Sequence, residues 1–129
     1  TLLEILQNDS SVEAQGYIAA LTILKSRFYT YPFKKLKYFN KGKRALEILI
    51  DENYGNPELH YLRFSIQISV PKFLGYNSSI NEDLLLLKNQ SAMDSLNKKT
   101  HSIILENILS SGQLSNEDSL YFTKIKNEL

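Results

Sequence analysis

The chain has 129 residues, of which 43% are hydrophobic, so it is long enough for one core and too short for two. Lysine and arginine number 15 against 14 acidic residues, and a net charge of +1 excludes a global field that would steer the chain toward nucleic acid or membrane. The absence of cysteine excludes disulfides, thiolate nucleophiles and cysteine-ligated metals. Apolar runs such as Leu84–Leu87 fall far below the roughly 20 residues that cross a bilayer. We therefore expect one soluble domain over residues 1–129.

Apolar residues at helical spacing predict a first helix over about residues 11–29. Ser10 and Glu13 fit the reciprocal cap that starts such a helix. Gly16 lies inside it and costs about 1 kcal/mol of helix propensity relative to alanine. Either a neighbouring helix approaches too closely for a side chain there, or the glycine is simply tolerated.

Two further helices are predicted over residues 32–52 and 57–70. Proline at the first position of each suits a first turn, where its missing N–H has no intrahelical partner. Gly55 follows the earlier helix at the spacing of a left-handed stop, and Asn56 can cap the later one. The inward face of the earlier helix is predicted to be Leu36, Phe39, Leu46, Leu49 and Ile50.

Residues 71–79 concentrate proline, glycine, asparagine and serine, which indicates a structured loop. Three of its apolar residues are expected to fold back on the core: Phe73, Leu74 and Tyr76. Ser79 and Glu82 repeat the capping-box pattern, which predicts that a helix begins there.

The remaining chain predicts three helices. The hydrophobicity of Leu84–Leu87 on all sides indicates a helix packed on more than one face. A second helix ends at Gly112, and Ser115 with Asp118 caps the last one. No long segment alternates apolar and polar residues with period two. We therefore expect about six helices in antiparallel hairpins and no strands.

The segment KGKRALEILIDENYGNPEL, residues 41–59, resembles half of a tetratricopeptide repeat, with Ala45 at the small-residue position and Asn56-Pro57 at the turn. The Gly-Tyr pair expected in the preceding helix is not found at its place. A longer stretch, from Gly16-Tyr17 through KLKYFNKGKRALEILI and NPELHYLRFSIQ to VPKFLGYNSSINED, resembles a family of uncharacterised bacterial tetratricopeptide-like proteins, many of them exported.

This resemblance implies a short TPR-like α-α superhelix and an envelope location, and it supplies no activity and no catalytic residue. About three stacked hairpins are needed for such a unit to be stable, because one hairpin cannot bury its own apolar face. The first residues, TLLEILQ, fit either the end of a helix packed on the first hairpin or an unstructured tail. Since residue 1 is threonine rather than methionine, we expect a trimmed or processed chain.

A basic and aromatic stretch runs from residue 25 to residue 44, with no acidic residue between Ala14 and Leu46. Its cations are Lys25, Arg27, Lys34, Lys35, Lys37, Lys41, Lys43 and Arg44. The aromatics among and beside them are Phe28, Tyr29, Tyr31, Phe33, Tyr38 and Phe39. The combination is typical of surfaces that bind anionic polymers such as single-stranded nucleic acid. We favour a structural explanation, in which the aromatics fill the core, the lysines face solvent and acids such as Glu47 and Asp51 balance them.

Several polar side chains share the helix predicted over residues 57–70. Arg63 could clamp the carboxylate of a ligand, or tie the fold together through Glu58 or a neighbouring helix end, and we favour the tie. His60 and His101 fit surface or packing positions, because neither belongs to a metal motif.

Glu82 and Asp83 resemble an acid–base pair, but at a helix start they are expected to offset the helix dipole. The chain contains no GxGxxG, GxxxxGK[ST] or GxSxG motif, so we predict no enzyme activity, no cofactor and no metal.

The leading functional hypothesis is a non-catalytic module that binds an unknown protein or peptide in a shallow groove; nucleic acid is not the expected partner. One alternative is a small-ligand protein or an enzyme without motifs, with a site near helix 57–70 and loop 71–79. Another is anionic polymer binding through segment 25–44, and a third is a purely structural element of a larger assembly. The candidate partner-binding residues are Tyr31, Lys34, Lys35, Lys37, Tyr38, His60 and Arg63.

Overall fold

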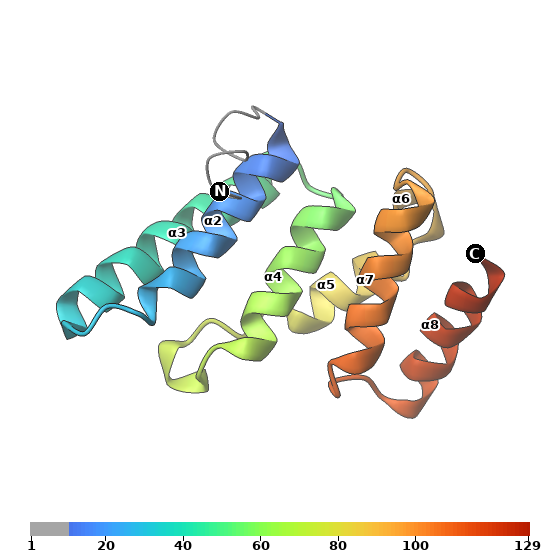
Figure 1. Ribbon diagram of the computed structural model, residues 1–129. Coiled ribbons are helices and arrows are strands. Elements are labelled where there is room, and N and C mark those ends of the chain that lie inside the picture. The colour runs from blue at the N-terminus through green and yellow to red at the C-terminus, as the bar shows by residue number, and fades with distance from the viewer. Residues whose placement is uncertain (1–10) are drawn as a thin grey trace.

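The structure is a computed structural model that describes residues 11–129 (Figure 1). Over this range the chain forms seven α-helices, one 3-10 turn and no strand. The helices are α2 (Val12–Ser26), α3 (Pro32–Glu52), α4 (Pro57–Ser69), α5 (Ile80–Leu87), α6 (Gln90–Met93), α7 (Lys98–Ser110) and α8 (Asn116–Glu128), and η1 (Lys72–Leu74) is the 3-10 turn. The prediction of an all-α fold of helical hairpins is confirmed, with the short α6 as an additional helix. The predictions for TLLEILQ and for a Ser10 cap lie outside the described residues.

Two glycines allow helices to approach closely. A Cβ at Gly42 of α3 would lie 2.7 Å from the backbone oxygen of Ala19 in α2. A Cβ at Gly16 of α2 would lie 2.5 Å from the side chain of Leu59 in α4. Of the two alternatives for Gly16, the structure favours the close approach of a neighbouring helix. Gly42 allows the backbones of the two helices of the first hairpin to come into contact.

Most predicted helix ends are confirmed. The side chain of Asn56 accepts hydrogen bonds from the backbone N–H groups of Glu58 and Leu59 at the start of α4. Ser115 caps α8 by accepting from the N–H of Asp118 at 3.1 Å. Gly55 has a φ of 95°, the left-handed conformation that favours glycine.

The capping box predicted at Ser79 and Glu82 is wrong. Ser79 has φ −109° and ψ 8°, away from the extended conformation of an N-cap, and its side chain caps no N–H group. Its backbone N–H instead donates to Oε1 of Gln67 in α4 at 2.9 Å. This bond ties the start of α5 to the last turn of α4.

Helix α4 lies between two hydrophobic clusters. Leu59, Leu62 and Ile66 face α2 and α3 in the first cluster. Phe64, from another side of α4, packs in the second cluster. The other fully enclosed members of the second cluster are Leu84, Leu87, Met93, Ile104, Leu105, Ile108 and Phe122. Since both clusters use α4, this helix joins the first hairpin to the C-terminal helices.

Some positions predicted to lie in the core are exposed, among them Leu36, Phe73 and Leu85. Leu36 of α3 and Phe73 of η1 both line an open hollow at the end of the first hairpin, where no further helix covers them. Leu85 also faces solvent, because α5 buries Leu84 and Leu87 on one side only. The prediction that Leu84–Leu87 packs on all sides is therefore wrong for Leu85.

Candidate functional site

A cluster of polar side chains lies between α3, α4, α5 and the loop after η1, and all of them are buried except Glu47, whose side chain is 35% exposed. We call it the buried charge network, and its members are Glu47, His60, Arg63, Tyr76 and Asp83. His60 and Asp83 are fully buried, and Arg63 is 4% exposed. Because a buried charge without partners would cost several kcal/mol, the geometry of this cluster decides whether it is a site or a structural tie.

Arg63 is bound by carboxylates on two sides. Its Nε donates to both oxygens of Asp83, at 3.2 and 2.9 Å, and its Nη2 donates to Oδ1 of Asp83 at 2.7 Å. Its Nη1 donates to both oxygens of Glu47, at 3.2 and 3.0 Å. Burial lowers the pKa of Arg63, but the hydrogen bonds and charges of Asp83 and Glu47 outweigh burial and raise this pKa above its ordinary value. The guanidinium therefore stays charged.

The two ring nitrogens of His60 have different partners. Nδ1 lies 2.8 Å from Oδ1 of Asp83, and the backbone N–H of Gly55 donates to Nε2 at 3.3 Å. Since an N–H donor needs an acceptor, Nε2 carries no hydrogen and Nδ1–H donates to Asp83. The ring of Tyr54 packs against the imidazole edge to face, with centroids 5.0 Å apart.

Two tyrosines complete the surroundings. The Tyr76 hydroxyl donates to Oε2 of Glu47 at 3.3 Å, and burial, followed by the charge of Glu47, raises the pKa of Tyr76. The Tyr54 hydroxyl donates to Oε1 of Glu82 at 2.8 Å, and this hydrogen bond is the main cause of the raised pKa of Tyr54.

The part of the buried charge network that could act as an acid–base site, His60 with Asp83, has no access from solvent. The His60–Asp83 pair has the arrangement of a general base, but Nε2, the nitrogen that would accept a proton, is occupied by Gly55 and fully buried. Arg63 ties α4 to the first turn of α5. The preferred hypothesis, a structural tie through Glu58 or a neighbouring helix end, therefore holds for the helix end and not for Glu58. Asp83 holds Arg63 and His60, a role beyond the dipole effect predicted for it.

On one face of the molecule α2 and α7 flank α4 (Figure 1). Side chains of these three helices line an open groove on this face. It has a volume of about 440 Å³. The apolar residues along it include Leu21 and Leu24 of α2, Leu62 of α4 and Ile103 of α7. Leu24 is 37% exposed and Ile103 46% exposed, so both present apolar surface to a ligand.

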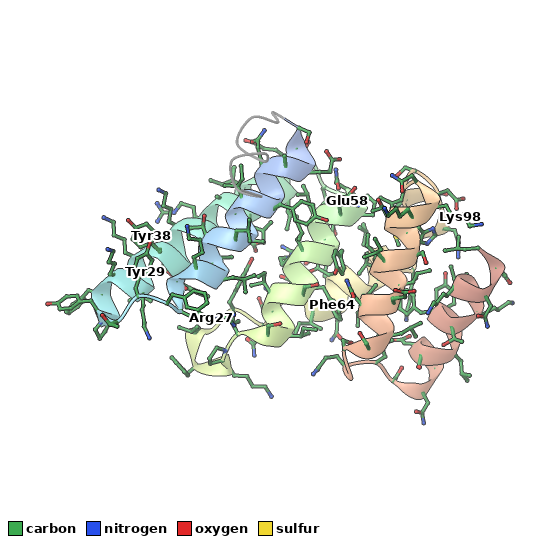
Figure 2. The ribbon with its side chains drawn as sticks, in the orientation of Figure 1. Arg27, Tyr29, Tyr38, Glu58, Phe64 and Lys98 are labelled. Atoms are coloured by element: carbon green, nitrogen blue, oxygen red, sulfur yellow. The ribbon has the colours of Figure 1, made fainter. Side chains whose placement is uncertain are left out.

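Polar groups line the same groove. Tyr17 donates to Oε2 of Glu58 at 3.4 Å, and Nδ2 of Asn107 donates to the Tyr61 hydroxyl at 2.6 Å. Burial and then the charge of Glu13 raise the pKa of Glu58, whereas the Tyr17 hydrogen bond opposes this rise. Burial and then the charge of Glu58 raise the pKa of Tyr17 to about 12. Figure 2 labels Glu58 near the first turn of α4.

A second hollow, of about 400 Å³, adjoins the loop in which the small-ligand alternative expected a site. It opens toward α2 and α3 rather than toward α4. Its lining is Ser26, Arg27, Pro32, Lys35, Leu36, Phe39, Pro71, Phe73 and Leu74. This lining is apolar and basic, and it includes no carboxylate or imidazole for acid–base chemistry.

The candidate partner-binding residues fall into two groups. Tyr31, Lys34, Lys35 and Lys37 are exposed and Tyr38 is partly exposed, all at the end of the first hairpin. His60 and Arg63 lie in the interior with their polar atoms bound within the chain, so they are not available to a partner in this arrangement.

The structural explanation of the basic and aromatic stretch is only partly confirmed. Phe39 is buried as that explanation predicts, but Phe28, Tyr31 and Phe33 are exposed. Glu47 pairs with Arg63, and no cation of segment 25–44 makes an ion pair among the described residues. The acids expected to balance these cations therefore do not do so by contact.

Within residues 11–129, no three histidine, cysteine, aspartate or glutamate side chains are placed to hold a metal ion. No helix in this range is long and apolar enough to cross a membrane. Comparison with protein-family models, curated proteins and solved structures finds no match to this chain.

Proposed function

We propose that this chain is a non-catalytic, TPR-like interaction module that binds a peptide segment of a partner protein in the groove between α2, α4 and α7. The observation that carries this proposal is the groove itself, which three successive hairpins border with partly exposed leucine and isoleucine. Helical repeat proteins bind partners on surfaces of this kind, formed by one helix from each hairpin.

The chemistry of the groove fits a peptide with apolar anchors. Leu24 and Ile103 would lose exposed area when an apolar side chain inserts between them, and burial contributes about 25 cal/mol for each Å² removed from water. Glu58 and Asn107 along the groove can exchange hydrogen bonds with the peptide and so fix its register.

Catalysis has less support. The His60–Asp83 pair, which has the arrangement of a base, is enclosed, and the second nitrogen of His60 accepts from Gly55. The hollow beside η1 offers cations and apolar groups but no general base. A role in binding requires no accessible general base.

The test is selection of peptides from a random displayed library with the purified chain, followed by titration against variants. Leu24→Asp and Ile103→Asp place a charge in the groove, and each should weaken the selected peptides by at least about tenfold. Leu120→Asp is the matched control, because Leu120 of α8 is also an exposed leucine and does not line the groove. Peptides that bind both groove variants as tightly as the wild type would refute the proposal, as would a selection that yields no binder.

A further inference from the structure

Four large, exposed aromatic side chains gather at the end of the first hairpin. Arg27 lies over the Phe28 ring at 5.0 Å, and the rings of Tyr31 and Phe33 contact each other at 6.2 Å between centroids. Phe28 is 73% exposed, Tyr31 66%, Phe33 79% and Phe73 85%. The first three belong to the α2–α3 turn and the start of α3, and Phe73 belongs to η1. These two segments line the same hollow and lie at the opposite end of the molecule from the C-terminus (Figure 1).

The residues that the structure describes at this end carry only positive charge. Residues 14–46 and 59–81 contain no aspartate or glutamate. The first of these stretches contains the cations of segment 25–44, and the second adds Lys72, which is exposed. None of these cations makes an ion pair within the part of the chain that the structure describes. The near-neutral total charge therefore hides a local excess of positive charge around exposed rings.

We infer that the end formed by the α2–α3 turn and η1 is a docking surface for an anionic lipid bilayer, with Phe28, Phe33 and Phe73 entering the interface and the surrounding lysines contacting lipid phosphates and carboxylates. Charge complementarity selects the acidic surface, because each lysine or arginine near such a membrane is attracted by its surface potential. The phenyl rings carry no polar atom, so they can leave water without losing a hydrogen bond. No membrane-spanning helix is needed for this kind of attachment.

The arrangement favours a bilayer over single-stranded nucleic acid. Bases stack on free aromatic faces in a groove. Here Tyr29 and Tyr38 are stacked on each other at 4.7 Å, and Lys34 and Lys41 lie over their rings. Figure 2 shows this pair and Arg27 at the end of the first hairpin, with Lys98 at the other end of the molecule. The rings of Phe28, Phe33 and Phe73 remain exposed on two separate segments, the α2–α3 turn with the start of α3 and η1. Exposed rings on two segments suit a broad surface better than a single strand of nucleic acid.

The test measures binding of the whole chain to phosphatidylcholine vesicles with and without phosphatidylserine. We expect co-sedimentation with the anionic vesicles that decreases with added salt, and little with the neutral ones. Changing Lys34, Lys35 and Lys37 to glutamine should lower the partition coefficient by about fivefold for each charge removed. Changing Phe28, Phe33 and Phe73 to serine should lower it by at least about tenfold.

Matched variants at the other end separate docking from general charge or hydrophobicity. Lys98→Gln, Lys99→Gln and Lys124→Gln remove the same charge, and Leu85→Ser with Leu120→Ser removes exposed apolar side chains elsewhere. We expect these variants to bind vesicles as the wild type does. Equal losses in the two sets of variants would overturn the inference.

Tryptophan fluorescence gives a positive signal of docking that does not require a variant to lose binding. The chain contains no tryptophan, so Phe33→Trp introduces a single reporter at the proposed surface and Leu120→Trp a single reporter away from it. Anionic vesicles should shift the emission of the first to shorter wavelength and leave that of the second unchanged. No shift at position 33, or binding to a single-stranded oligonucleotide without binding to the vesicles, would refute the bilayer as the ligand. Because this surface does not include the groove residues Leu24 and Ile103, its failure leaves the peptide-binding proposal untouched.

Discussion

Arg63 of α4 and Asp83 of α5 form a buried ion pair, in which three hydrogen bonds of 2.7 to 3.2 Å join the guanidinium to one carboxylate. The pair links two helices whose interacting residues are 20 positions apart. Glu47 supplies a second carboxylate from α3, so one arginine connects three helices. This arrangement keeps α4 in the position from which it lines the groove.

Replacing Asp83 with asparagine should destabilise the fold strongly. The change removes the main counter-charge of the buried Arg63, and loss of one partner of a buried pair costs about 3 to 5 kcal/mol. Denaturant unfolding measures this loss. Glu82→Gln is the control, because Glu82 is exposed and lies 3.6 Å from Arg63, so it should cost less than about 1 kcal/mol. Similar losses in the two variants would show that Asp83 has no special role.

The tautomer of His60 is a second expectation. Because Gly55 donates to Nε2, the hydrogen of the neutral ring should be on Nδ1. Long-range proton–nitrogen NMR of the folded chain at neutral pH distinguishes the two nitrogens. A spectrum with the hydrogen on Nε2 would mean that the Gly55 contact does not form in solution.

His101 should make stability dependent on pH. Burial lowers the pKa of His101 below its ordinary value of 6.5, against a smaller opposing effect of Asp94. Below pH 6.5, His101 therefore binds a proton more readily in the unfolded chain than in the folded chain. The free energy of unfolding should consequently decrease as the pH falls through this range. Well above pH 6.5, where His101 is neutral in both states, its contribution to stability does not change with pH.

The His101→Gln variant isolates the effect of His101. The difference in unfolding free energy between wild type and variant should shrink as the pH is lowered from neutral to below 6.5, since all other groups titrate in both proteins. A difference that does not change with pH would argue that His101 is as accessible in the folded chain as in the unfolded one.

The glycine in α3 should tolerate no side chain. A Cβ at Gly42 would lie 2.7 Å from the backbone oxygen of Ala19 and 2.9 Å from the backbone nitrogen of Ile23. Backbone cannot rotate away, so Gly42→Ala should lower stability by about 1 to 3 kcal/mol, although alanine is the better helix former. Gly16→Ala should cost less, because its closest contact is the end of the flexible Leu59 side chain. Thermal unfolding of the two variants compares them, and a more stable Gly42→Ala variant would refute the close helix approach.

The helices were predictable because their signals are local. Asn56 before Pro57, Ser115 before Asp118 and Gly55 in a left-handed turn all act within a few residues. The error at Ser79 has the opposite origin. Its backbone bonds Gln67, 12 positions away, and this long-range contact replaces the local cap.

Of the buried charge network only the tie from Arg63 to a neighbouring helix end was predicted, although a signal for a larger cluster was present. His60, Arg63 and Gln67 recur at the spacing of one helix face on an otherwise apolar helix, which indicates a buried polar stripe. Their partners could not be found from the pattern, because Glu47 and Asp83 meet Arg63 only through tertiary packing. The exposure of Phe28 and Phe33 escaped prediction for a similar reason, since helical spacing does not tell which end of a hairpin lacks a neighbour.

The most direct test of the binding account is backbone NMR of the labelled chain titrated with a library-selected peptide. The account predicts that the shifted amide signals concentrate in residues 17–24, 58–66 and 100–107, the parts of α2, α4 and α7 that line the groove. Shifts concentrated instead at the end of the first hairpin, around Tyr31 and Lys35, would contradict it.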